Sequence, residues 1–265
     1  MIRLIATDLD GTLVAPDGAI SALDLAALQA AAEAGVTVVV ATGRPLRWLG
    51  VLDAVRSAHP LVIVSNGAGL YDLDRRRLLA ARYLGCDVIA EVMDAVRAVV
   101  PDVSFALERG DRFGCEDGPL AGFLRGPGTL VAPADRLLAE LGPVLKLLVC
   151  HGQVSNGELA GHVAVAVGSR VEVTWSMADD RFAMVELAAP GVSKEAALAT
   201  LCAQLGVAAS DVVAFGDMPN DAGMLSWAGR GFVMANGDAA MQDRFEVAGS
   251  NADSGVGRKI LELLG

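Results

Sequence analysis

Four short clusters of polar residues in this chain could do chemistry, and each of them follows an apolar stretch of strand length. The clusters are Asp8-Leu9-Asp10-Gly11-Thr12, Thr42-Gly43-Arg44, Ser65-Asn66-Gly67 and the segment from Gly216-Asp217 to Asn220-Asp221. Taken singly, each cluster is also typical of an ordinary turn or helix start. Four such clusters in equivalent positions are harder to explain as loop chemistry alone.

The four clusters are expected to meet at one edge of a parallel sheet. The apolar stretches that they follow are 1–7, 35–41, 61–65 and 211–215. In open parallel sheets, ligands bind at the carboxyl ends of the strands. Asp8 and Asp217 are far apart in the sequence, but this topology would bring their side chains together.

Such an edge would crowd the carboxylates of Asp8, Asp10, Asp217 and Asp221 into one crevice. Two anions ~4 Å apart repel each other by about 4 kcal/mol at an effective dielectric constant of about 20. The cluster therefore needs a cation or shifted pKa values. Because no Cys or His accompanies these acids, a hard ion is favoured. Mg²⁺ fits best, since it uses one or two carboxylates together with water and substrate phosphate.

A metal ion held by carboxylates beside hydrogen-bond donors suggests that the site binds phosphate. Thr42 can donate a hydroxyl, and the backbone N–H of Gly43 can approach an anion closely. Lys194 follows Ser193, which is the expected N-cap of a helix, so its charge would lie at the N-terminal edge of that helix. Viewed in isolation, Lys194 is more typical of a solvated surface lysine.

Alternating strands and helices at both ends of the chain must position these residues. This pattern predicts an α/β domain with a parallel sheet and right-handed crossovers. Its first helix is expected to begin at Ser21, with Asp24 as the capping-box partner, and to end before Gly35. Further helices are expected over about 45–58, over 193–206, from about 221, and over 259–264.

The middle of the chain, about residues 85–186, has a different pattern and is predicted to form an inserted α+β unit. The expected elements are helices near 87–99 and 155–168 and strands at 103–107, 112–116, 144–150, 171–175 and 182–187. The predicted domains are therefore a core of residues 1–84 and 187–265 and an inserted domain of residues 85–186.

Composition and charge exclude several classes of protein. With 265 residues, 53% of them hydrophobic, the chain can bury a core without disulfides. Lys and Arg number 21 against 32 Asp and Glu, and the net charge of −11 disfavours nucleic-acid binding. No charge-free apolar run approaches the ~20 residues that a membrane span needs. Neither the cysteines nor the histidines have zinc-binding spacing, and a cytoplasmic protein is expected.

In these residues the chain resembles the haloacid dehalogenase (HAD) superfamily of phosphohydrolases, and more narrowly the Cof-type sugar-phosphate phosphatases. The family's four motifs are DxDGT, a Thr or Ser that ends a strand, a lysine, and GDxxND. They are matched, in that order, by Asp8–Thr12, Thr42, Lys194 and Gly216–Asp221. The late segment 250–256 also matches, whereas Asn236-Gly237 stands where relatives more often have Asn-Ala.

The resemblance covers residues 1–84 and 187–265, and over the middle segment it extends only to position and coarse pattern. It implies a Rossmann-like parallel-sheet core that carries the catalytic site. It also implies that the inserted α+β unit is a cap domain that determines substrate specificity.

The resemblance further implies a Mg²⁺-dependent phosphatase that works through an aspartyl-phosphate intermediate. Asp8 would be the nucleophile and Asp10 the general acid and base. The metal would be bound by Asp8, Asp10 through its backbone carbonyl, Asp217 and Asp221, the last directly or through water. The residues implied to bind phosphate or substrate are Leu9, Thr42, Gly43, Arg44, Asn66, Lys194 and Asn220. In the cap, Arg109, Arg112 and Glu116 are candidates for contacts with the leaving group, although a solvated charge is the commoner role.

The expected substrate is a small phosphorylated metabolite, either a sugar phosphate or a cofactor phosphate, and the expected protein is a monomer or small homo-oligomer. Two alternatives stay open. A phosphomutase or phosphotransferase would use the same aspartyl-phosphate chemistry, with a second hydroxyl in place of water. A signalling protein would hold the phosphoryl group on aspartate without turnover, although an acceptor at position 8 and a large insertion count against it.

Overall fold

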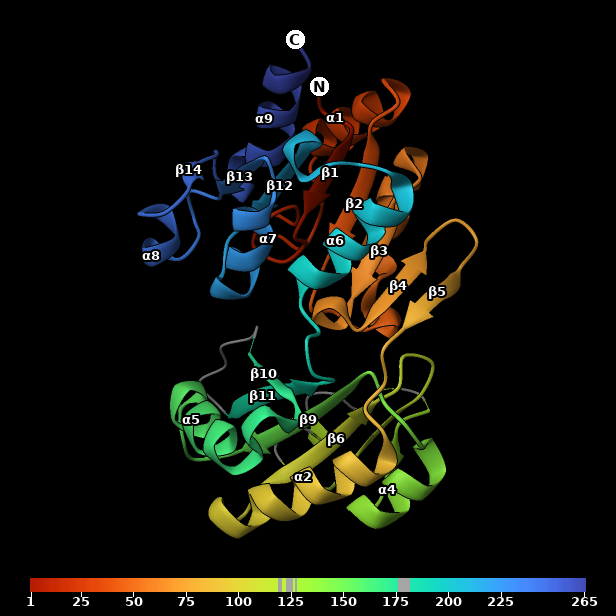
Figure 1. The fold of residues 1–265 in the computed structure, drawn as a ribbon, viewed down its shortest axis with the longest axis vertical. Coiled ribbons are helices and arrows are strands. Elements are labelled where there is room, and N and C mark those ends of the chain that lie inside the picture. Colours follow the sequence, from red (N-terminus) through yellow and green to blue (C-terminus); the bar gives the residue numbers. More distant parts are fainter. Residues whose placement is uncertain (119–120, 123–125, 127, 176–181) are drawn as a thin grey trace. The chain divides into compact units, whose positions relative to one another are not determined.

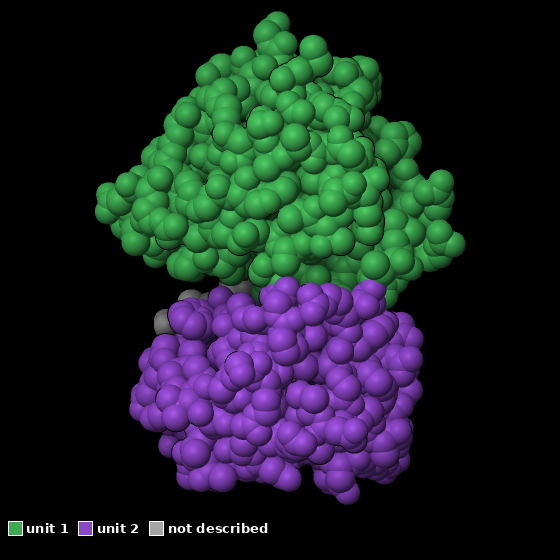
Figure 2. All heavy atoms as spheres, viewed as in Figure 1, with its two compact units in different colours: residues 1–44, 48–80, 193–265 green, residues 45–47, 81–192 purple. Residues whose placement is uncertain are grey.

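The computed structural model describes residues 1–118, 121–122, 126, 128–175 and 182–265. The chain divides into two compact units, which Figure 2 colours separately. Unit 1 comprises residues 1–44, 48–80 and 193–265, and unit 2 comprises residues 45–47 and 81–192. The predicted boundaries after residues 84 and 186 differ from these by a few residues, and the second of them falls within a strand of unit 2.

Unit 1 is built around an eight-stranded sheet ordered β14-β13-β12-β1-β2-β3-β4-β5 (Figure 1). The strands are β1 (Leu4–Thr7), β2 (Thr37–Ala41), β3 (Leu61–Val64), β4 (Gly69–Asp72), β5 (Arg77–Ala81), β12 (Val212–Gly216), β13 (Arg230–Val233) and β14 (Glu246–Val247). From β14 to β3 neighbouring strands pair in parallel, and β4 is antiparallel to β3. The predicted parallel sheet is thus confirmed.

Helices cover both faces of this sheet. They are α1 (Ala22–Glu33), α6 (Lys194–Leu205), α7 (Ala222–Trp227), α8 (Ala239–Gln242) and α9 (Gly255–Leu264). On one face, Leu198 of α6 and Met224 of α7 lie in a buried cluster with Leu4 of β1. Alternate side chains of a strand, such as Ile5, point to the opposite face, where α1 packs against β2 and against α9. Burial on both faces explains why these strands are rich in Val and Ile.

Two predicted helix starts are confirmed by their caps. The Asp24 N–H donates to Ser21 Oγ (3.0 Å), and Ser21 Oγ donates to the Asp24 carboxylate (2.7 Å), so α1 begins directly after Ser21. The Ala196 N–H donates to Ser193 Oγ (3.0 Å), so α6 begins at Lys194. Each hydroxyl accepts from a backbone N–H that has no partner within its helix.

The prediction of a continuous helix over residues 45–58 is wrong. The structure has short 3₁₀ helices at Leu46–Trp48 and Gly50–Ala58 instead. The chain passes from unit 2 to unit 1 between residues 47 and 48, and the Trp48 carbonyl accepts a hydrogen bond from Arg44 Nη1 (3.1 Å). The apolar spacing of this segment indicates its buried face but gives no sign of the change of unit.

Unit 2 contains a six-stranded sheet ordered β10-β11-β9-β6-β7-β8. Its strands are β6 (Ser104–Glu108), β7 (Phe113–Cys115), β8 (Leu130–Val131), β9 (Lys146–His151), β10 (Glu172–Thr174) and β11 (Ala183–Ala188). The helices that lie on one side of it in Figure 1 are α2 (Cys86–Val99), α4 (Ala134–Leu141) and α5 (Asn156–Val167). The α+β pattern predicted for the middle of the chain is confirmed, and α4 and β8 are additional to it. Across the part of the chain that the structure describes, no helix is long and apolar enough for a membrane span.

Asp24 joins the first and last helices of unit 1. Its side chain is buried, and Oδ1 accepts from the Gly257 N–H at the start of α9 (2.6 Å). Burial raises the pKa of Asp24, and the hydrogen bonds from Ser21 and Gly257 lower it. The carboxylate therefore links α1 to the N-terminal end of α9, where the helix dipole favours negative charge.

Asp24→Ala should lower the free energy of unfolding by roughly 1–3 kcal/mol, because the substitution leaves the buried Gly257 N–H without an acceptor. Urea denaturation measures this loss. The matched control is Asp17→Ala, which removes an exposed carboxylate that accepts from the Ala19 N–H and should change stability by less than about 0.5 kcal/mol. Equal losses of unfolding free energy in the two variants would contradict the role of Asp24 in linking α1 to α9.

Candidate active site

The predicted polar clusters lie at one edge of unit 1, where four neighbouring parallel strands end. Asp8 follows β1, Thr42 follows β2, Ser65 follows β3, and Asp217 follows β12. Because β12 pairs with β1, β1 with β2, and β2 with β3, these four strand ends are adjacent. Residues separated by more than two hundred positions are therefore brought together by the sheet order.

The ammonium group of Lys194 lies at the centre of this edge. Nζ donates to Asp8 Oδ1 (2.5 Å) and to Asp221 Oδ1 (2.6 Å), and the side chain is 1% exposed. Burial alone would lower the pKa of Lys194, but the carboxylates of Asp221 and Asp8 raise it above its ordinary value. A solvated surface lysine is thereby excluded, and Lys194 remains a cation within the site.

Three buried carboxylates surround this cation. Oxygen atoms of Asp8, Asp217 and Asp221 all lie within 4.8 Å of one another. Burial raises the pKa of Asp8 well above its usual range, as does repulsion by Asp221 and Asp217, while Lys194 opposes the rise. Burial and the charge of Asp221 raise the pKa of Asp217 to about 6. Three carboxylates facing one ammonium group leave the cluster with surplus negative charge.

Asp221 also holds the loop that follows β12. Its Oδ2 accepts from the backbone N–H groups of Asp217 and Met218, both at 3.1 Å, while Oδ1 faces Lys194. A Cβ at Gly216 would lie 2.6 Å from Asp221 Cγ, so only glycine fits there. The GDxxND spacing thus has a structural reason, because the last acid folds back onto the first two residues of its own loop.

Asp10 lies outside the cluster of three carboxylates and is exposed. Arg44 donates to both of its oxygens, from Nη2 to Oδ1 (2.6 Å) and from Nε to Oδ2 (2.8 Å). This pairing raises the pKa of Arg44. The contact between Arg44 and Asp10 was not predicted from the sequence, because the two residues belong to different loops.

The other predicted phosphate-binding residues of the first two loops lie beside this pair. Thr42 is buried, and its Oγ1 accepts from the Arg44 N–H (3.0 Å), with half-buried Gly43 between them. Leu9 buries its side chain completely, so only its main chain is available to a ligand.

The loop after β3 packs closely against the residue before Lys194. Ser65 and Asn66 have φ values of +52° and +55°, and a Cβ at Gly67 would overlap the Ser193 carbonyl. Asn220 Nδ2 donates to Asn66 Oδ1 (3.3 Å), which links this loop to the one after β12. Non-glycine residues in this conformation are energetically costly and cluster at functional sites.

The three candidate residues of the inserted unit contact the helices and strands of unit 2. Arg109 Nη1 donates to the Leu141 carbonyl (2.6 Å), and Arg112 Nη1 donates to the Glu140 carbonyl (2.7 Å), both near the C-terminal end of α4. Positive charge is favoured at that end of a helix. Their contacts with a leaving group stay predictions.

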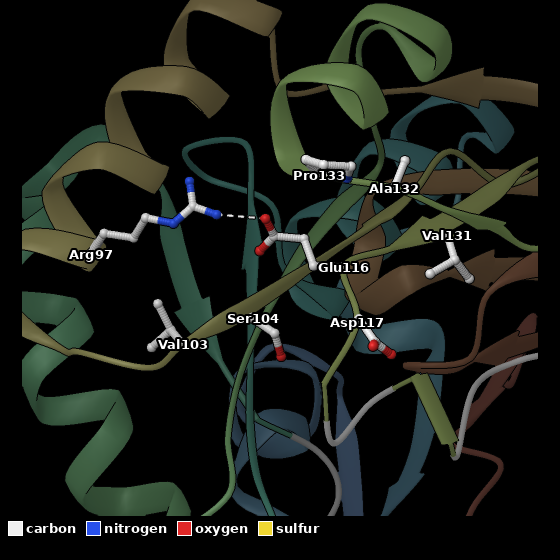
Figure 3. A pocket seen from close by; sticks show the side chains of 8 residues that line it. All are labelled: Arg97, Val103, Ser104, Glu116, Asp117, Val131, Ala132 and Pro133. Atoms are coloured by element: carbon white, nitrogen blue, oxygen red, sulfur yellow. Dashed lines mark hydrogen bonds and ion pairs between the residues drawn. The ribbon is translucent and has the colours of Figure 1, made fainter.

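Glu116 lies at the wall of a pocket in unit 2. Its carboxylate faces the Arg97 guanidinium at 2.6 Å (Figure 3). The pocket has a volume of about 510 Å³, and it is lined by Arg97, Val103, Ser104, Glu116, Asp117, Val131, Ala132 and Pro133. None of the residues predicted in the core clusters lines it. Ser104 Oγ is buried there without a hydrogen-bond partner among the residues that the structure describes.

Four charged residues on one face of the unit 2 sheet were missed. Arg47 Nε donates to Glu108 (2.7 Å), and Lys146 Nζ lies 2.9 Å from Glu186. Glu108 faces Lys146 directly across β6 and β9, so the charges alternate in sign along the row. Burial raises the pKa of Glu108, against the effect of Arg47 and Lys146. A single charge inside an apolar strand, such as Lys146 in VLKLLVC, is the sequence signal that could have revealed this row.

Comparison with known proteins places this geometry in a family. The sequence profile of the haloacid dehalogenase-like hydrolases matches residues 5–260. An HMP-PP phosphatase of Escherichia coli (strain 55989 / EAEC) is 31% identical over 237 residues, which are 89% of this chain and 85% of that protein.

Two solved structures share the fold over nearly their whole length. The HAD phosphatase BT1666 of Bacteroides thetaiotaomicron superposes with a TM-score of 0.84 at 24% identity, covering 99% of this chain and 95% of that chain. The HAD subclass IIB sugar phosphatase BT4131 superposes with a TM-score of 0.83 at 18% identity, covering 98% of each chain. The two superpositions show the fold that the chain shares with these proteins. The profile match and the relative at 31% identity show that the chain belongs to the family of haloacid dehalogenase-like hydrolases.

Proposed function

We propose that this protein is a Mg²⁺-dependent phosphatase that hydrolyses small phosphorylated metabolites through an aspartyl-phosphate on Asp8. The observation that carries the proposal is the buried contact of Lys194 with Asp8 and Asp221, with Asp217 in the same cluster. The names of the relatives support the substrate class, because an HMP-PP phosphatase and a sugar phosphatase both act on small phosphorylated molecules.

The donor set of the cluster fits a hard divalent cation. The three clustered side chains offer only carboxylate oxygen atoms, and when all three are ionised they carry two negative charges more than Lys194 offsets. Asp8, Asp217 and Asp221 would bind Mg²⁺ together with the Asp10 backbone carbonyl. When bound, Mg²⁺ supplies positive charge that reduces the repulsion between an anionic nucleophile and a phosphoryl group.

The reaction divides into two displacements at phosphorus. In the first, an Asp8 carboxylate oxygen forms a bond to phosphorus while the leaving-group oxygen departs with a proton from Asp10. In the second, Asp10 takes a proton from water, the water oxygen attacks phosphorus, and inorganic phosphate leaves with Asp8 regenerated. The phosphoryl oxygens are bound by the Lys194 ammonium, the Thr42 hydroxyl and the Asn220 amide.

The contact between Asp10 and Arg44 has a consequence for the first displacement. Both Asp10 oxygens accept hydrogen bonds from Arg44 in this structure. A protonated Asp10 must donate to the leaving-group oxygen through one of its two oxygens, so that oxygen has to give up its hydrogen bond from Arg44, while the other can still accept. The guanidinium is then available to the substrate anion, which agrees with the predicted role of Arg44 in substrate binding.

Asp8→Asn should abolish phosphate release from an aryl phosphate, by more than about a thousandfold, because the amide is not a nucleophile. Colorimetric detection of inorganic phosphate measures the loss. The matched control is Asp87→Asn, an exposed acid in the first turn of α2, which should keep full activity. Undiminished turnover by a folded Asp8→Asn variant would refute the assignment of the nucleophile.

Asp217→Asn should stabilise the metal-free protein at about pH 7, by roughly 1–3 kcal/mol, because it removes a buried charge that the folded state disfavours. The folded-state pKa of Asp217, about 6, lies above its unfolded value of 3.8. The wild-type protein therefore loses stability as the pH rises from about 4 to about 6, and the penalty stays constant above that range. The variant avoids this loss.

Thermal unfolding in EDTA across this pH range measures the difference between the two proteins. Excess Mg²⁺ should reverse their order, because only the wild-type protein keeps all three carboxylates and gains stability by binding the ion. An Asp217→Asn variant that is less stable than wild type in EDTA at about pH 7 would contradict the claim that the carboxylate cluster carries surplus negative charge.

A further inference from the structure

Two asparagines from the C-terminal part of unit 1 clamp the loop that follows Asp10. Asn236 Nδ2 donates to the Gly11 carbonyl (2.8 Å), and Asn251 Nδ2 donates to the Val14 carbonyl (2.8 Å). The two asparagines are also joined to each other, because the Asn251 N–H donates to Asn236 Oδ1 (2.9 Å). Both ends of the loop 11–14 are therefore held by residues more than two hundred positions away.

The clamped loop directly contacts Asp217, one of the three clustered carboxylates. Thr12 Oγ1 donates to Asp217 Oδ1 (2.9 Å). Gly11, with a φ of +83°, lies so close that a Cβ there would overlap the Asp217 carboxylate. A shift of the loop would therefore move or rotate the Asp217 side chain.

The turn that carries Asn236 also holds the backbone of Asp217. The Asp238 N–H donates to the Asp217 carbonyl (2.8 Å). A Cβ at Gly237 would lie 2.7 Å from the same carbonyl oxygen, so this position requires glycine or a displaced backbone. The turn 236–238 therefore contacts both the loop after β1 and the residue that ends β12, and it sets the spacing between them.

We infer that Asn236 and Asn251 are positioning residues for the metal-binding carboxylates. Neither of them touches Asp8, Asp217 or Asp221 through its side chain in the contacts described above. They act through the loop 11–14, whose distance from Asp217 determines whether the carboxylates can bind one cation together. The inference rests on the proposed function, since it assigns these residues to the same site.

Asn236→Ala and Asn251→Ala should weaken the binding of Mg²⁺ alone by about 10–100-fold, which is the usual effect of losing residues that orient metal ligands. Isothermal titration calorimetry of the full-length, metal-free protein measures this affinity without reference to turnover. At saturating Mg²⁺ the variants should lose kcat for an aryl phosphate more than they change KM, because the substrate-binding residues are intact.

The matched control is Ser21→Ala, which removes the N-cap of α1 and lowers stability by about 0.5–2 kcal/mol. Among the residues that the structure describes, Ser21 forms hydrogen bonds with Asp24 and Ser254 and none with the loop 11–14, so this variant should bind Mg²⁺ as the wild-type protein does. Variants of the two asparagines that unfold more easily but keep wild-type Mg²⁺ affinity would overturn the inference, since their role would then be structural only.

Asn236 is exposed, so the Asn236→Ala variant should fold. If the Asn251→Ala variant does not fold, the Mg²⁺ affinity of Asn236→Ala alone tests the positioning role. A wild-type protein that binds no Mg²⁺ would overturn the proposed function and this inference together. If the wild-type protein binds Mg²⁺ and the asparagine variants bind it equally well, only the positioning role is overturned.

Discussion

The buried ammonium group of Lys194 holds together two carboxylates that would otherwise repel each other. Asp8 comes from the first strand and Asp221 from the loop after β12, and each lies within 2.6 Å of Nζ. Burial of a lysine is tolerated only where such partners offset the loss of hydration. The arrangement therefore requires the sheet to bring β1 and β12 side by side and α6 to begin where Lys194 does.

Several local features follow from that requirement. Ser193 is the N-cap of α6, which begins at Lys194, and the loop after β3 reaches the Ser193 carbonyl because Gly67 has no side chain. Asp221 can face Lys194 with one oxygen because its other oxygen is held by two backbone N–H groups. The site is thus fixed by backbone contacts at its edges, while its centre carries more negative than positive charge. A centre of this kind favours a bound cation and is less stable without one.

The strand pattern and the helix caps could be predicted from the sequence because they depend on neighbouring residues. Apolar stretches followed by polar clusters predicted β1, β2, β3 and β12 and the meeting of their ends. Ser21 and Ser193 predicted the starts of α1 and α6. The resemblance to the family added the assignment of Lys194 to this site. Its residue type alone suggested a solvated side chain.

Contacts between loops could not be predicted in this way. Arg44 contacts Asp10, and Asn236 contacts Gly11, through loop conformations that depend on the whole of unit 1. The helix predicted over residues 45–58 was wrong because the apolar spacing of this segment does not indicate that the chain changes from one unit to the other there. The charged row that contains Lys146 and Glu186 forms where strands from different parts of the sequence pair in one sheet.

The central claim is that Asp8 takes up the phosphoryl group, and trapping the covalent intermediate tests it most directly. The wild-type enzyme would be mixed with Mg²⁺ and a phosphorylated metabolite that it turns over, quenched in acid, digested and analysed by mass spectrometry. We predict a peptide heavier by one phosphoryl group, with the modification on Asp8. A phosphoryl group found on another residue, or complete turnover with unmodified Asp8 at every quench time, would contradict the account.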